Sequence, residues 1–176
     1  MNRTRKMAHI AVLVALAMAL HAVESALPLP VAVPGAKLGL ANIIALLALV
    51  LYGFQAAMFV VVFRSLLGSF FLGNFLGFGF YLSLVGAVFS MLAMALALWF
   101  WRRERLSLVA VSIVGAVVHN TAQVGLASLI IGNMNLLKLY LPLLLILAIP
   151  AGFFTGLAVF YCQRVLVRAI RDLPEG

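Results

Sequence analysis

Three hydrogen-bonding side chains lie close together in an apolar run that extends from about residue 106 to residue 131. His119, Asn120 and Gln123 belong to the stretch GAVVHNTAQVG, and each is costly to strip of water. At about 100° per residue, a helix places all three within roughly a 100° arc. Such a stripe must face protein or water rather than lipid. It indicates either hydrogen bonding between helices, which is the better interpretation for His119 alone, or the lining of a ligand cavity, which fits the whole stripe better.

Charged residues and further amides occur in the neighbouring apolar segments. Arg64 interrupts VVVFRSLLGS, and Glu24 is the acidic residue expected at the same depth. Arg64 therefore indicates either an ion pair with Glu24 or a site where the guanidinium fork receives an anionic ligand. Lys37 indicates either an interfacial lysine whose amine reaches water or a second cation of the same site. Asn42 and Asn74 are the remaining candidates for ligand binding.

The residue types that carry most enzyme chemistry are scarce. The chain has one cysteine, Cys162, and one aspartate, Asp172, with no Ser–His–Asp order, paired carboxylates or metal-ligand spacing. It also has no GxxxxGK[ST] phosphate loop, so any energy from ATP would have to come from partner subunits. We therefore expect no catalytic residue, no metal and no cofactor bound by this chain.

The segments that hold the candidate residues are apolar enough to cross a membrane. Of the 176 residues, 66% are hydrophobic and only 9% are charged, against about a quarter in soluble domains, and the mean hydropathy is +1.24. A soluble fold could not bury this much apolar surface. We predict a single all-α integral membrane domain covering residues 1–176. Its six spanning helices are expected at about residues 7–26, 38–52, 54–68, 81–101, 107–131 and 139–168.

The basic residues predict the orientation of these helices. The net charge is +8, and the basic clusters lie at residues 3–6, 102–105 and 164–171, whereas the alternate connections contain at most one basic residue each. The positive-inside rule then places both termini in the cytoplasm. The polar candidates fall in the outer half, which predicts a ligand site open to the outside. No separate basic domain is present, so nucleic-acid binding is excluded in favour of lipid contact.

The first helix carries a face of small residues. Removing bulk along one line lets another helix approach closely. The two interpretations are packing within this chain and docking on another polypeptide. His21 and Glu24 lie on the opposite side of the helix. The small residues are Ala8, Ala11, Ala15, Ala19, Ala22 and Ala26, which fall within a wedge of about 80°.

Three short motifs, in this order and spacing, resemble a known membrane family. KLGLAN (37–42), RSLLGS (64–69) and HNTAQ (119–123) are similar to the family labelled "heptaprenyl diphosphate synthase component I", which is grouped with the Gx transporters. The alanine face, the proline-rich segment 27–35 and six spans in fewer than 200 residues also resemble the substrate-binding S components of energy-coupling factor transporters. The resemblance covers residues from about 8 to 168.

The resemblance implies a six-helix bundle that captures a micronutrient or precursor from outside. Such a bundle docks through its first helix on a transmembrane T subunit that is driven by two cytoplasmic ATPases, in the bacterial cytoplasmic membrane. Ala11, Ala15 and Ala19 match the docking motif, and residues 27–37 would cover the ligand. The word synthase does not suit the sequence, because prenyl-chain elongation needs magnesium held by clustered aspartates and the chain has only Asp172.

Two functions of different classes follow. In the first, the chain is the binding subunit of an importer for a small anionic or amphiphilic ligand, with quinone or isoprenoid precursors and vitamins among the candidates. Arg64 and Lys37 attract its anionic part, the 119–123 stripe orients it, and Glu24 balances Arg64 or binds a donor on the ligand. In the second, the chain is a non-transporting membrane anchor for a polyprenyl or quinone biosynthetic enzyme, and the stripe is structural.

Overall fold

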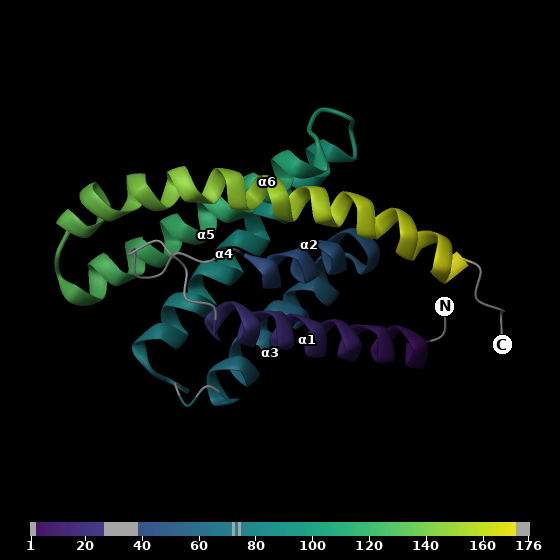
Figure 1. Cartoon of the computed structure of the whole chain (residues 1–176), viewed down its shortest axis with the longest axis horizontal. Helices are drawn as coiled ribbons and strands as arrows, with labels where there is room; N and C mark the ends of the chain where they lie inside the picture. Colours follow the sequence, from purple (N-terminus) through teal and green to yellow (C-terminus); the bar gives the residue numbers. More distant parts are fainter. Residues whose placement is uncertain (1–2, 27–38, 72, 74, 172–176) are drawn as a thin grey trace.

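The computed structural model describes residues 3–26, 39–71, 73 and 75–171, and this part of the chain forms six helices and no strand. The helices occur where the sequence predicts them, with ends that differ by a few residues. This confirms the predicted all-helical membrane fold (Figure 1). The helices are α1 (Arg3–Ala26), α2 (Leu40–Tyr52), α3 (Phe54–Phe71), α4 (Phe78–Trp101), α5 (Leu108–Ile131) and α6 (Asn135–Arg171).

Five helices are long and apolar enough to cross a membrane, and α2 is the exception. Its 13 residues extend about 20 Å, which is less than the hydrocarbon thickness of about 30 Å. The start of α2 also lies inside the bundle, because a Cβ placed on Gly39 would be 3.7 Å from Thr155 Cγ2, near the middle of α6. A sixth complete crossing therefore stays a prediction. Helix α1 begins and helix α6 ends on the same side of the bundle (Figure 1), and the cytoplasmic location of this side stays a prediction.

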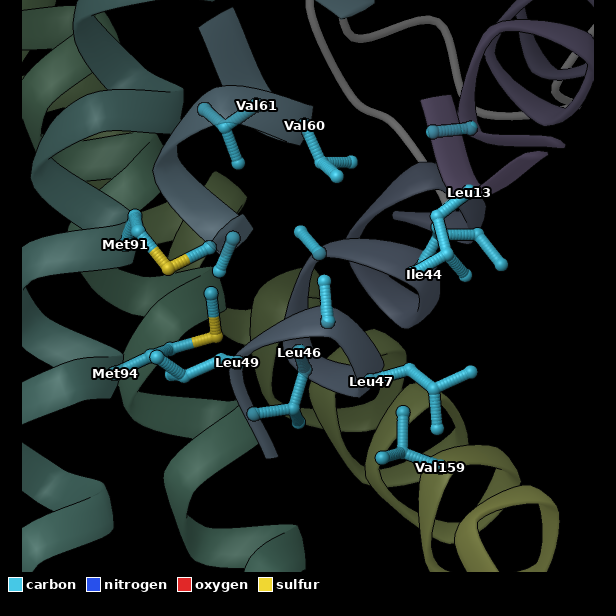
Figure 2. Packing of buried hydrophobic residues seen from close by; sticks show 14 of the residues in the cluster. Leu13, Ile44, Leu46, Leu47, Leu49, Val60, Val61, Met91, Met94 and Val159 are labelled. Atoms are coloured by element: carbon cyan, nitrogen blue, oxygen red, sulfur yellow. The ribbon is translucent and has the colours of Figure 1, made fainter. Parts of the chain in front are cut away.

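Helix α2 forms the centre of the hydrophobic core. Its residues from Ile44 to Leu49 are all buried, and they pack against α1, α3, α4 and α6 (Figure 2). A helix that is apolar on all sides is stable only when it is surrounded. Glycines with positive φ lie at both ends, Gly39 (78°) and Gly53 (85°), and Gly53 allows the chain to pass directly into α3. A hydrogen bond of 2.9 Å between Tyr52 Oη and His9 Nδ1 joins α2 to α1.

The most extensive contact between helices joins α5 and α6. It is centred on the GxxxG sequence GFFTG, in which both glycines are buried. A Cβ on Gly152 would lie 2.7 Å from Ile113 Cα, and one on Gly156 would lie 2.7 Å from Val109 Cα. These distances show that the two backbones approach closely, which is the packing that GxxxG permits in membranes. Helix α6 continues without a break through Pro142 and Pro150 and arches across the bundle (Figure 1).

Substitution of Gly156 tests whether this close approach holds the fold together. Gly156→Ala should destabilise the protein by about 1–3 kcal/mol, because the new methyl group meets backbone that must shift. The matched control is Gly125→Ala in α5, where a Cβ meets nothing within 4 Å; there alanine should be neutral or stabilising by up to about 1 kcal/mol. Thermal unfolding of the purified protein in detergent measures both. Equal midpoints for the two variants would contradict the packing described.

Candidate functional site

A polar cavity lies where the six helices meet, and all six contribute residues to its wall. Its free space of about 40 Å³ holds roughly three water molecules. This is comparable with a carboxylate or phosphate group, and a larger ligand requires side chains to move. The residues with polar side chains in the wall are His21, Glu24, Asn42, Arg64, Ser83, Ser112, His119, Asn120 and Thr155.

Glu24 and Arg64 bring opposite charges into this cavity from α1 and α3. Each side chain is only 5% exposed, and the charge of Glu24 acts on Arg64. The Glu24 carboxylate also accepts a hydrogen bond from the backbone N–H of Gly39, immediately before α2. Since the N-terminus of a helix carries a partial positive charge, one carboxylate faces both a guanidinium and a helix N-terminus. The charge balance of the described groups is therefore positive, which suits an anionic ligand.

The predicted stripe on α5 divides between the cavity and the helix interface. Ser112, His119 and Asn120 line the cavity, whereas Gln123, one turn further on and half-buried, does not. The Asn120 side-chain amide donates to the carbonyl of Leu144 at 3.2 Å, so this residue also links α5 to α6. Both features, the cavity wall and the hydrogen bond between helices, therefore meet in Asn120. Its opposite face is not uniformly turned to lipid, because α5 packs against both α4 and α6 and Val111 is fully buried.

Glycine on a neighbouring helix makes room for the imidazole at the centre of the stripe. A Cβ on Gly86 of α4 would lie 3.1 Å from both His119 Cε1 and the His119 carbonyl oxygen. No larger residue fits there without a shift of α5. The position of His119 in the cavity wall thus depends on α4 as much as on its own helix.

The structure adds polar residues that the sequence did not assign to the site. His21 was placed on the polar side of α1 but not in the site, and it lines the cavity beside Glu24. Thr155 of α6 forms a buried hydroxyl pair with Ser112 at 2.7 Å and donates to the Gly152 carbonyl at 3.1 Å. Ser83 of α4 completes the wall. Single hydroxyls in apolar runs carry little signal, since they hydrogen-bond to backbone in many membrane helices.

Five of the eight predicted ligand-binding residues are thus assembled in one cavity. Lys37 and Asn74 lie outside the described residues, and Gln123 is apart from the wall. The five that meet are Glu24, Asn42, Arg64, His119 and Asn120.

The alanine face of α1 is exposed in the part of the chain that the structure describes. Ala11, Ala15 and Ala19 are exposed, whereas Leu13 and Ala17 on the other side are buried in the core. Among the described helices, the packing of α1 thus relies on the opposite face. Their smooth surface faces outward, where docking on another polypeptide stays a prediction.

The fold and the cavity define a multi-pass α-helical membrane protein with a charged, hydrogen-bonding cavity among its helices. The family model described as "Heptaprenyl diphosphate synthase component I" matches residues 13–162, and the chain belongs to this family. This confirms the resemblance to that family, whereas the likeness to S components of energy-coupling factor transporters stays a prediction. No curated protein and no solved structure matches the chain. Among the described residues, no three histidine, cysteine, aspartate or glutamate side chains cluster as a metal site.

Neutralising Glu24 and Arg64 tests whether they act as a charge pair. Glu24→Gln or Arg64→Gln alone should lower the free energy of unfolding by about 3–5 kcal/mol, because each leaves the other charge buried and uncompensated. The double variant should lose less than the sum of the single losses, as measured by denaturant unfolding in detergent. Additivity within about 0.5 kcal/mol would show that the two charges are independent. Glu104→Gln and Arg105→Gln, both exposed at the opposite end of α4, form the control pair and should show no coupling.

Proposed function

We propose that this protein is the substrate-binding subunit of a membrane importer, similar to the S components of energy-coupling factor transporters. Its ligand is a small anionic or amphiphilic micronutrient or precursor taken up across the bacterial cytoplasmic membrane. A partner T subunit and two ATPases supply the energy, since the chain has no phosphate loop of its own. Both termini lie in the cytoplasm, as the basic clusters predict.

The observation that carries this proposal is the convergence of charges and hydrogen-bonding groups in the cavity. Ionisable residues inside a membrane bundle are expensive and mark ligand or ion pathways. A purely structural pair would need only Arg64 and Glu24, but the same wall also presents Asn42, His119 and the Ser112–Thr155 hydroxyls. A small space lined by hydrogen-bonding groups from several helices is typical of a ligand site.

The outward alanine face of α1 supports the second element of the proposal. Close helix docking requires small residues along one line, and Ala11, Ala15 and Ala19 present such a line on the bundle surface. This face suits a T subunit. It equally suits the rival function, in which the chain anchors a prenyl or quinone biosynthetic enzyme that supplies the catalysis named in the family description. The cavity favours the importer, because an anchor needs no charged interior.

Mass spectrometry of small molecules retained by the gently purified protein tests the importer proposal. The wild type should carry a stoichiometric ligand, and Arg64→Gln should retain at least tenfold less, because the ligand loses its cationic partner. Ala116→Leu, which narrows the cavity and keeps every charge, should also lose it. The control is Arg105→Gln, an exposed arginine far from the cavity, which should retain the ligand in full.

Uptake into vesicles separates the two functions. Accumulation of the identified ligand should require this chain together with a T subunit and ATPases, and should fail with Ala11→Leu, which changes the exposed alanine face. If the Arg64 and Ala116 variants retain ligand like the wild type while Ala11→Leu abolishes assembly with a biosynthetic enzyme, the anchor is correct and the importer is wrong.

A further inference from the structure

The outer surface between α1 and α3 contains an apolar groove next to the polar cavity. Its free space is about 390 Å³, roughly ten times that of the cavity. The groove is formed by the small residues Ala15, Ala19 and Ala22 of α1 together with Gly68 and Phe71 of α3. The alanines and Phe71 are exposed at the surface of spanning helices, so the groove is open to the side, toward lipid.

The groove and the cavity share one wall residue. His21 belongs to the wall of both, and it is half-buried. Gly68 permits this position, because a Cβ there would lie 3.2 Å from His21 Cδ2. Glu24 follows one turn later on the same side of α1 and lines the cavity but not the groove. A movement of the His21 ring would therefore join a charged space to an apolar one.

We propose that the ligand is a single-chain amphiphile, with its anionic head in the cavity beside Arg64 and its hydrocarbon tail in the α1–α3 groove. This inference rests on the proposed function and adds the class of its substrate. The head must be small, a carboxylate or a phosphate, because the cavity holds only about 40 Å³. The ligand enters sideways from the membrane past His21.

Charged and polar groups line the cavity and apolar groups line the groove, as a ligand with an anionic head and a hydrocarbon tail requires. The cavity contains the Arg64 guanidinium and the Ser83 hydroxyl, which can donate to an anion. The start of α2 adds a partial positive charge, and its Gly39 N–H donates to Glu24. The groove has almost no polar surface, since its wall consists of three alanine methyl groups, Gly68, the side chains of Met18 and Phe71, and the His21 imidazole. A fully polar solute would make no favourable contact with the groove, and a hydrocarbon would make none with Arg64.

Binding to the full chain in phosphatidylcholine nanodiscs, without partner subunits, tests the proposal. Four probes are used: decyl phosphate and decanoate, which have tails, and inorganic phosphate and acetate, which have none. At least one tailed probe should bind tenfold or more tightly than its tailless counterpart. The tighter of the two tailed probes names the head group. Equal Kd values with and without a tail, or no binding of either tailed probe, would overturn the proposal, because an ordinary lipid chain would then account for the groove.

Substitutions that fill the groove locate the tail. Ala19→Leu places a larger side chain in the groove from the exposed side of α1, where folding should be unaffected, and should weaken binding of the tailed probe about tenfold while leaving the tailless one unchanged. Ala8→Leu makes the same change on the same exposed face, outside the groove, and should bind like the wild type. An Ala19→Leu variant that binds the tailed probe normally overturns the tail site.

Ala116→Leu, which narrows the cavity and keeps every charge, separates this inference from the function on which it rests. If it abolishes binding of every probe while Ala19→Leu changes nothing, the cavity is a ligand site and the tail is wrong. If it changes the binding of no probe, the cavity itself is wrong as the anion site, and the proposed function fails with it.

Discussion

The structure depends on keeping a carboxylate and a guanidinium inside a bundle that is surrounded by hydrocarbon. Neither Glu24 nor Arg64 is exposed by more than 5%, and such groups persist only if polar atoms from the protein replace water. The replacement comes partly from backbone, because Gly39 donates its N–H to Glu24. This contact requires α2 to begin inside the bundle. The short central helix, its positive-φ glycine and the polar cavity are thus consequences of one electrostatic requirement.

Small residues perform two separate tasks in this molecule. Inside the bundle, Gly152 and Gly156 bring α5 against α6, and Gly86 admits His119 between α4 and α5. Lipid tails are as apolar as leucine, so close van der Waals contact, rather than the hydrophobic effect, holds membrane helices together. On the outside, the alanines of α1 leave a smooth face that is exposed among the described helices. Small residues therefore complete the fold in one place and leave an open surface in another.

The family description names a synthase component, whereas the described residues form a cavity without a metal cluster. The two are compatible if the chain supplies recognition and a partner supplies chemistry. The polar cavity and the apolar groove share His21 in their walls, so the proposed positions of a ligand's head and tail adjoin.

The sequence by itself determined the membrane class, the positions of the six helices and most of the charged site. These follow from local properties: hydropathy over about 20 residues, helical periodicity and the high cost of a charge in hydrocarbon, which makes Arg64 conspicuous in any apolar run. The sequence also distinguished the two faces of α1, because helical periodicity places the alanines on one side and Glu24 on the other.

Only the tertiary structure decided which helices meet. The placement of α2 inside the bundle, the exposure of Ala15 and the exclusion of Gln123 from the cavity depend on contacts between distant segments. Thr155 and Ser83 could not be assigned from the sequence, since a lone hydroxyl satisfies itself on its own helix as readily as it lines a site. The position of His21 between cavity and groove is likewise fixed by Gly68 on another helix, and no local pattern encodes that meeting.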